Sequence, residues 1–260
     1  MPTTFLGWVS FLLEEYGPLF LQGTINTMIV AITGTVLGFL IGLLIAIAKT
    51  IPTTQSDSII KKFFVKLVNI ILSIYIEVFR GTPMIVQAMV IYYGALQYLN
   101  INMPEMVAAV FIISINTGSY MAEIIRGGII SVDNGQREAA QSIGMTHWQT
   151  MTGVVLPQAI RNIMPSIGNE FVVNIKDSSV LNVIAVSELF FTAKSAAGTY
   201  LKYFEVFFIV GAIYLVLTFT VTRILRLIER YMDGSENYVI HGSQSDSRAD
   251  IHISTNKGGQ

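Results

Sequence analysis

The stretch Glu138-Ala139-Ala140 decides the fold; Gly144 follows it after three residues, and Val154-Val155-Leu156-Pro157 follows after nine more. This polar stretch separates two long apolar segments of the chain. The pattern predicts a short helix, a turn at Gly144, and a second helix that returns into the apolar part of the chain.

Residues at the ends of these two helices support the prediction. Asn134 is a preferred type for capping the first helix, and Thr146 forms a capping box with Gln149 at the start of the second. Gly144 can adopt the left-handed conformation that ends a helix at little steric cost. Pro157 fits a helix start or a kink, because it lacks the N–H that a helix interior needs.

The same spacing resembles the signature of the integral-membrane permease subunits of binding-protein-dependent ABC importers. That signature is Glu-Ala-Ala, three residues, Gly, nine residues, Ile, one residue and Leu-Pro, and the chain departs from it only at Val154. The resemblance implies an all-α membrane protein of the type I importer class, with about five transmembrane helices and a short cytoplasmic coupling helix. It also implies an ATPase-coupling role for Glu138, Ala139, Ala140 and Gly144.

Four further motifs narrow the resemblance to the branch that carries polar amino acids, which includes glutamine, histidine and arginine permeases. They are the runs Phe79–Pro83, Tyr120–Ile129, Leu156–Arg161 and Lys176–Ser179. The likeness covers about Gly23 to Arg230. It implies ATP-driven import of a polar amino acid, with the basic ones included, by alternating access.

The composition independently favours a polytopic membrane protein. Hydrophobic residues make up 52% of the 260 positions and charged residues 13%. The net charge of −1 shows no basic excess for nucleic acid, and without Cys there is no disulfide framework or thiolate metal site. A cleavable signal peptide does not fit the N-terminus, because Glu14 and Glu15 interrupt it.

Three regions are predicted along the chain. Residues 1–22 form an amphipathic extracytoplasmic segment along the membrane face, residues 23–230 the transmembrane domain with its coupling loop at about 134–156, and residues 231–260 a disordered cytoplasmic tail. The amphipathic spacing is set by Trp8, Leu12, Tyr16 and Leu19.

Five apolar segments in residues 23–230 are long enough to span the roughly 30 Å hydrocarbon core, which takes about 20 residues. The second is too long for one straight span, and its interruption at Arg80-Gly81-Thr82-Pro83 predicts a bend or an interfacial helix. In the first, Gly34, Gly38 and Gly42 predict close helix packing. The five segments are about 24–48, 63–99, 106–125, 157–186 and 203–225.

The distribution of Lys and Arg predicts the orientation in a bacterial inner (plasma) membrane. Twelve of these residues fall on one side of a five-span arrangement and two on the other, so the coupling loop and the C-terminus are expected in the cytoplasm and the N-terminus outside. The two residues on the outer side are Lys194 and Lys202. The twelve are Lys49, Lys61, Lys62, Lys66, Arg126, Arg137, Arg161, Arg223, Arg226, Arg230, Arg248 and Lys257.

A polar stripe in the fourth span is the candidate substrate-binding site. Its members are spaced four, four and three residues apart, so they share one face of a helix. Ionisable groups at membrane depth are costly and by default mark a pathway or a paired site. Two carboxylates on one face would favour a cationic or zwitterionic solute. The four residues are Ser166, Glu170, Asn174 and Asp177.

A purely structural alternative remains for these carboxylates. Glu170 and Asp177 could instead pair with Lys176 or Arg80 of neighbouring helices and touch no solute. Arg80 and the Glu123/Arg126 pair are equally compatible with stabilised helix ends or with a gate.

The sequence also bears on the partners of the chain and on its cofactors. No G-x-x-x-x-G-K-[ST] loop occurs, so ATP and Mg²⁺ are expected on a partner ABC ATPase dimer and no cofactor on this chain. The family implies an extracytoplasmic substrate-binding protein and a second permease subunit, either identical or similar. His241 and His252 lack ligand-spaced neighbours, so no metal is expected. No catalytic constellation is found, which argues against an enzyme. The alternative is a secondary transporter or channel that uses the intramembrane carboxylates, although no inverted repeat supports it.

Overall fold

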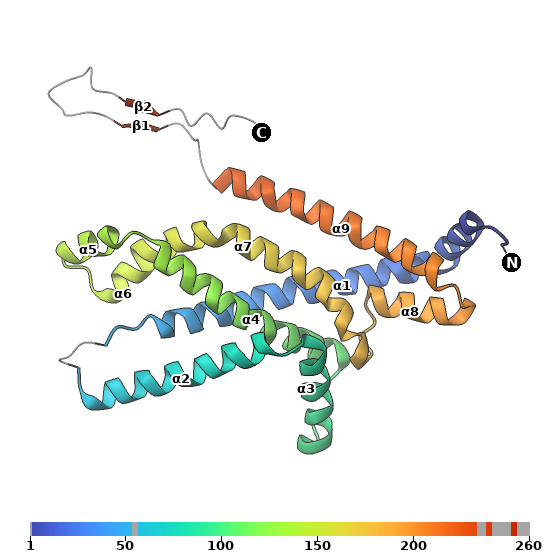
Figure 1. Cartoon of the computed structure of the whole chain (residues 1–260), viewed down its shortest axis with the longest axis horizontal. Helices are drawn as coiled ribbons and strands as arrows, with labels where there is room; N and C mark the ends of the chain where they lie inside the picture. Colours follow the sequence, from blue (N-terminus) through green and yellow to red (C-terminus); the bar gives the residue numbers. More distant parts are fainter. Residues whose placement is uncertain (1, 54–56, 233–237, 241–250, 254–260) are drawn as a thin grey trace.

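The computed structural model describes residues 2–53, 57–232, 238–240 and 251–253. Figure 1 shows the long helices running roughly side by side along the longest axis, with one shorter helix, α3, standing across them. The fold is an α-helical membrane protein, and its helices pack mainly against α1 and α4.

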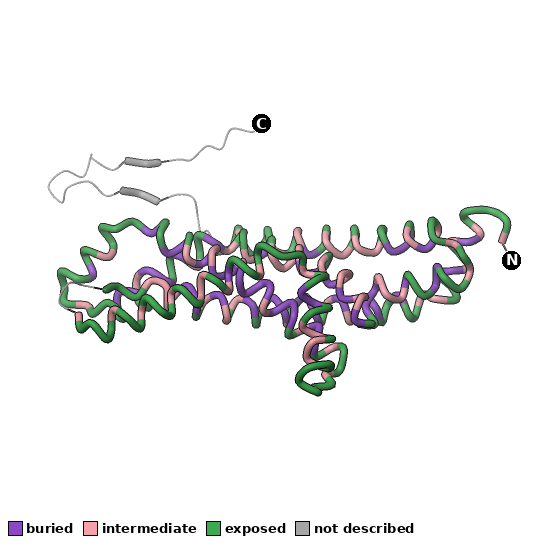
Figure 2. Tube along the Cα trace, turned by 60° about the horizontal axis from the view of Figure 1, so that its bottom comes forward, coloured by how far each residue is buried: buried purple, intermediate pink, exposed green. Residues whose placement is uncertain are grey.

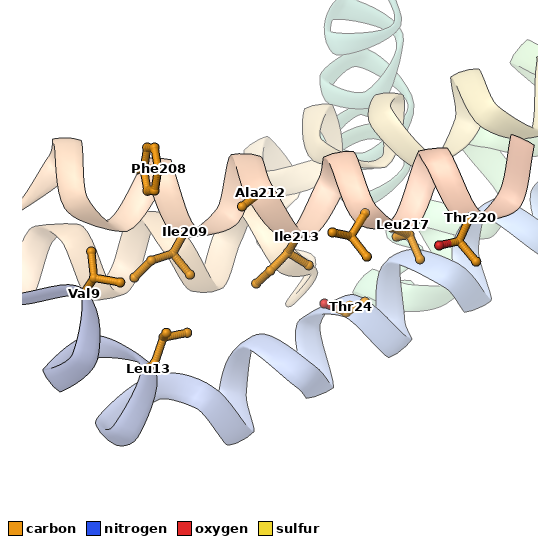
Figure 3. A pocket seen from close by; sticks show the side chains of 10 residues that line it. Val9, Leu13, Thr24, Phe208, Ile209, Ala212, Ile213, Leu217 and Thr220 are labelled. Atoms are coloured by element: carbon orange, nitrogen blue, oxygen red, sulfur yellow. The ribbon is translucent and has the colours of Figure 1, made fainter. Parts of the chain in front are cut away.

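The first helix, α1 (Phe5–Lys49), continues for 45 residues, so the expected surface segment and the first span form one element. Trp8, Leu12 and Phe20 are buried, and the last two pack with residues of α8 (Leu189–Tyr200) and α9 (Tyr203–Met232). Figure 3 shows Val9 and Leu13 facing α9 across an apolar groove. The amphipathic face therefore packs on protein, which the sequence pattern alone could not distinguish from a membrane surface.

A break between α2 (Ile59–Gly81) and α3 (Met84–Leu99) confirms the predicted interruption at Pro83. The Gln87 side-chain amide donates to the backbone oxygens of Phe79 and Thr82, both at 2.9 Å. These bonds satisfy two carbonyls near the end of α2, and that of Phe79 lacks a helical donor because Pro83, four residues later, has no N–H. The break lets α3 turn away from the bundle (Figure 1).

The glycine ridge of α1 packs closely on α4 (Glu105–Ser131), as predicted. A Cβ added at Gly34, Gly38 or Gly42 would come within 2.1, 2.7 and 2.5 Å of the nearest α4 side-chain atom, respectively. Real Cβ atoms do not approach that closely, so only glycine allows the two backbones to lie at this separation. The α4 partners also recur every fourth residue: Ile113, Thr117 and Met121.

The second half of the chain begins with α5 (Asn134–Ser142) and α6 (His147–Thr150). A π-helical turn (Met151–Val155) joins α6 to α7 (Leu156–Asp177), and a 3₁₀ segment (Ser178–Ile184) follows. The helical run His147–Ile184 then bends by 54° into α8. The fourth predicted span is therefore the second part of a longer helical run, which starts in the coupling loop.

By length and apolar composition, three helices in the described part of the chain could each cross a membrane, and the bent pair could supply a fourth crossing. The three are α1, α4 and the Tyr203–Tyr231 part of α9. Many large apolar side chains point outward, among them Leu44, Phe204 and Val216, each at least 66% exposed. Figure 2 shows exposed residues over the outer faces and buried ones where the helices cross. Such a surface suits lipid rather than water.

Most of the expected tail at 231–260 lies outside the described residues. Within it, β1 (Tyr238–Ile240) pairs with β2 (Ile251–Ile253) in an antiparallel ladder, with Tyr238 opposite Ile253. The composition of the tail had not predicted strands.

Candidate functional site

The stretch from α5 to α6 forms an elbow at one end of the molecule (Figure 1). Its first cap is Asp133 rather than Asn134: the Asp133 Oδ1 accepts a 2.6 Å hydrogen bond from the Gly135 N–H. Asn134 is instead the first helical residue. Both residue types cap helices well, so the sequence did not decide between neighbours.

The turn at Gly144 has the predicted left-handed backbone, with φ of +86°. The Gly144 N–H donates to the Gln141 oxygen at 3.0 Å, and the Met145 N–H donates to the Ala140 oxygen at 3.1 Å. These two bonds form a Schellman motif, which satisfies carbonyls at the end of α5. A residue with a Cβ would be strained at Gly144, so glycine fixes the direction of the elbow.

The start of α6 confirms the predicted capping box. The Gln149 N–H donates to Thr146 Oγ1 at 3.3 Å, and the Thr146 N–H donates to Gln149 Oε1 at 2.9 Å. Pro157 follows one residue into α7, after the π-helical turn. The wider turn alters the hydrogen-bonding register just before the proline, so the helix passes through this position without a break.

The four predicted coupling residues differ in exposure. Glu138, Ala139 and Gly144 are exposed, whereas Ala140 is 5% exposed and packs within the chain. The elbow also presents Ile143 and Trp148, which are 79% and 59% exposed. Apolar side chains exposed beside a carboxylate form a surface that a partner protein could cover.

Arg137 fixes the elbow to the bundle, because its Nη2 donates to the Ile129 oxygen near the end of α4 at 2.7 Å. The Glu123–Arg126 pair lies three to six residues before Ile129 on α4, with 2.8 Å between Arg126 Nη2 and Glu123 Oε2. Each charge of that pair is matched by the other, which fits the stabilising interpretation of this helix end.

A cavity of about 550 Å³ lies where the α2–α3 break meets α4 and α7. Glu170, Asn174 and Asp177 line it, so the structure brings together three of the four residues of the predicted stripe. Ser166 is exposed and does not line the cavity. The remaining lining residues are Arg80, Gly81, Thr82, Pro83, Met84, Asn116, Tyr120 and Val173.

Asn174 is buried, and its side chain is bonded within the protein. Its Nδ2 donates to Thr35 Oγ1 at 2.8 Å, and its Oδ1 accepts from Thr117 Oγ1 at 3.0 Å. The amide thus joins α7 to α1 and α4 at the floor of the cavity. These two bonds account for the burial of Asn174 without any contact to a solute.

Glu170 and Asp177 are half-buried, and neither forms an ion pair with a residue that the structure describes. Lys176, one of the two partners considered above, is exposed and lines a different groove. Arg80, the other, is in the cavity, where its guanidinium carbon lies 5.5 Å from the centroid of the Tyr120 ring. Arg80 and the two carboxylates therefore line one cavity without forming an ion pair with one another.

Sequence reasoning did not include Arg80, Asn116 and Tyr120 in the candidate site. Asn116 is held by Gln87, whose Oε1 accepts its Nδ2–H at 2.9 Å. The available signal was the Arg80–Pro83 interruption itself, since chain breaks at membrane depth occur where backbone lines a cavity or is buried in protein. No group of three or more potential metal ligands occurs among the described side chains.

Comparison with known proteins supports one family. The family described as "Binding-protein-dependent transport system inner membrane component" matches residues 58–234. The glutamine transport system permease protein of Escherichia coli (strain K12) is 35% identical over 216 residues, which cover 83% of this chain and 93% of that protein. The arginine transport system permease protein of Bacillus subtilis (strain 168) is 33% identical over 219 residues, which cover 84% and 94%.

Solved structures give the same result. A chain in a crystal structure of an amino acid ABC transporter with histidines is 42% identical in sequence to this one, with a TM-score of 0.75. The match covers 89% of this chain and 100% of that chain. The inward-facing MetNI methionine ABC transporter is similar in fold, with a TM-score of 0.69 at 19% identity, over 84% of this chain and 98% of its own. The chain described here belongs to the family of inner membrane components of binding-protein-dependent transport systems.

Proposed function

We propose that this chain is the permease subunit of an ATP-driven importer for a polar amino acid, with the basic ones included. The observation that carries the proposal is the cavity in which Arg80 faces Glu170 and Asp177. An α-amino acid carries a carboxylate and an ammonium group, and charge-assisted hydrogen bonds from Arg80 and from the two carboxylates would hold both. The permeases with which the chain aligns, named for glutamine and arginine, support this solute class.

The elbow is the proposed contact with an ABC ATPase dimer, which would bind ATP and Mg²⁺. Glu138 would pair with a basic residue of that partner, while Ala139 would allow close approach and Gly144 would turn the chain back to the bilayer. The exposure of these residues, with Ile143 and Trp148 beside them, supports the assignment. Ala140 would support the elbow from within.

The helical run His147–Ile184 provides a mechanical link between the two sites. Glu170 lies 23 residues after His147 on this run, which at about 1.5 Å per residue amounts to roughly 35 Å. A movement imposed on α6 would therefore reach the cavity wall as a rigid-body displacement, which is the kind of change that alternating access needs. A binding protein outside the cell and a second permease subunit would complete the transporter, with the N-terminus outside and the C-terminus in the cytoplasm.

The test is uptake by the complete transporter, purified with its partner chains and reconstituted in proteoliposomes with the membrane potential clamped by K⁺ and valinomycin. We expect arginine, histidine or glutamine to accumulate only with ATP inside and the binding protein outside. Uptake that follows an imposed ion gradient without ATP would overturn the proposal and favour a secondary transporter or channel.

A further inference from the structure

A second polar surface lies between α7 and α9, away from the cavity. It consists of two adjoining grooves of about 240 Å³ each, which share Val172, Thr222 and Arg226. We call the pair the α7/α9 furrow. The first groove is lined by Val172, Lys176, Leu215, Thr218, Phe219, Thr222, Arg223 and Arg226.

Three cations line this first groove, and no Asp or Glu does: Lys176 comes from α7, and Arg223 and Arg226 come from α9. All three side chains are exposed, and none forms an ion pair with any residue in the described ranges. Asp177, the neighbour of Lys176, lines the solute cavity instead. The first groove thus gathers three positive charges and has no acidic side chain in its lining.

The other polar side chains of the groove do not change this balance. Thr218 Oγ1 donates to the Tyr214 oxygen at 2.8 Å, and Thr222 Oγ1 donates to the Thr218 oxygen at 2.7 Å. Their hydrogens are therefore used by the helix itself. The Arg223 guanidinium carbon lies 4.8 Å from the centroid of the Phe219 ring, which supports the side chain on the helix surface.

Glu229 is the one acidic residue that lines the adjoining groove, where it lies beside Arg226. No ion pair between Glu229 and Arg226 occurs in the structure. One carboxylate set against three cations leaves the furrow with an excess of positive charge.

The position of the furrow indicates what could neutralise it. α9 is one of the helices long and apolar enough to cross a membrane, and Leu215 and Phe219 of the groove are largely exposed on its surface. Unpaired cations are costly at membrane depth unless they reach the interface or find a counter-charge. Basic pockets between membrane helices bind anionic lipid head groups, and arginine pairs with phosphate through two parallel hydrogen bonds.

We infer that the α7/α9 furrow binds an anionic phospholipid in the leaflet at the Arg230 end of α9. Arg223 and Arg226, one turn apart, would contact the phosphate, and Lys176 would add a third positive charge. An acyl chain would then lie along Leu215 and Phe219. This inference concerns a structural lipid and does not depend on which solute the transporter carries.

The experiment is native mass spectrometry of the purified full-length chain in detergent, titrated with phosphatidylglycerol or with zwitterionic phosphatidylcholine. Arg223→Gln/Arg226→Gln removes both guanidinium groups, and the control pair Arg226→Gln/Arg230→Gln removes the same net charge but keeps Arg223. Arg230→Gln alone is the second control, because Arg230 lies on the same helix and lines neither groove.

We expect the wild type to bind phosphatidylglycerol at least about tenfold more tightly than phosphatidylcholine. Both lipids offer a phosphate, but the choline of the second lipid carries a positive charge, which the three cations of the furrow repel. Arg223→Gln/Arg226→Gln should abolish that preference, Arg226→Gln/Arg230→Gln should halve it on a logarithmic scale, and Arg230→Gln should leave it unchanged. If Arg223→Gln/Arg226→Gln gives no signal from folded protein, Lys176→Gln is measured instead. Its affinity for phosphatidylglycerol should fall about fivefold.

Four results would overturn the inference. The first is equal binding of the two lipids by the wild type, and the second is an equal loss in Arg230→Gln, which would indicate net charge rather than a site. The third is a loss of dimer mass in the Arg223→Gln/Arg226→Gln variant with unchanged lipid affinity, which would assign the furrow to a second copy of the chain. Displacement of phosphatidylglycerol by equimolar glycerol phosphate would likewise exclude a lipid-specific site.

Discussion

At the scale of single residues, the polar side chains of α7 that line the cavity are of two kinds. Asn174 is bonded on both sides of its amide, whereas Glu170 and Asp177 keep their carboxylates without ionic partners among the described residues. Residues of the same polar stripe thus have different predicted roles. Two substitutions distinguish these roles.

Replacing Glu170 with Gln should weaken uptake of a cationic solute more than that of a neutral one. The change removes one negative charge at nearly constant size, and a charge-assisted hydrogen bond contributes about 1.5–3 kcal/mol. We expect KM for arginine to rise about tenfold, and KM for glutamine by much less. The measurement is uptake by the reconstituted transporter, with Glu105→Gln, an exposed carboxylate at the start of α4, as the control. Equal effects on the two solutes would contradict the prediction.

Replacing Asn174 with Ala should lower stability, since Thr35 and Thr117 each lose a buried partner. Unsatisfied buried groups cost about 1–3 kcal/mol each. We expect a lower Tm for the purified protein, measured by circular dichroism, and an unchanged Tm for Glu170→Gln. A wild-type Tm in Asn174→Ala would show that the two hydrogen bonds contribute little.

At the scale of helices, the contact between α1 and α4 depends on three glycines. Gly38 lies where an added Cβ would be 2.7 Å from the Thr117 Cβ, whereas nothing lies within 4 Å of a Cβ added at Gly211 on α9. The two positions therefore make a matched pair for the same substitution.

Gly38→Ala should destabilise the protein by about 1–3 kcal/mol, because overpacking forces the helices apart. Gly211→Ala should be neutral or stabilising by up to about 1 kcal/mol, since alanine is the better helix former. Thermal unfolding of the two purified variants side by side measures the difference. If both behave alike, the close approach of α1 and α4 does not contribute to stability.

The helices also show what the sequence could and could not predict. Caps and turns are local, so the box at Thr146 and the left-handed Gly144 followed from neighbouring residues. The continuity of α1 did not follow, because burial of Trp8 and Leu12 depends on α8 and α9, which lie far along the chain. The π-helical turn has no signal of its own in the residues Met151–Val155.

The candidate site divides in the same way. Glu170, Asn174 and Asp177 share a face by helical spacing alone, so their common position was predictable. Arg80 lies about 90 positions earlier on another helix, and periodicity within one element carries no information about which helices meet. The same argument explains Ser166: spacing placed it on the stripe, but the extent of the cavity is set by α2, α3 and α4.

At the scale of the whole molecule, the elbow and the cavity lie on one helical run. Glu138→Arg should abolish ATP-coupled uptake while the protein still inserts and folds, because it reverses the charge at the proposed contact with the ATPase. We expect uptake to fall to background and the ATPase to co-purify less with the permease. Glu105→Arg, a charge reversal on a different exposed surface, is the control. Wild-type uptake by Glu138→Arg would argue against a coupling role.

The π-helical turn at Met151–Val155 joins α6 to α7 and sets the rotation of α7 about its axis relative to α6. A π-turn takes up one residue more than an α-turn, so the number of residues in this turn determines which side of α7 presents its carboxylates to Arg80. The direction of the Glu170 and Asp177 side chains around the axis of α7 thus depends on the length of a five-residue turn that lies outside the cavity.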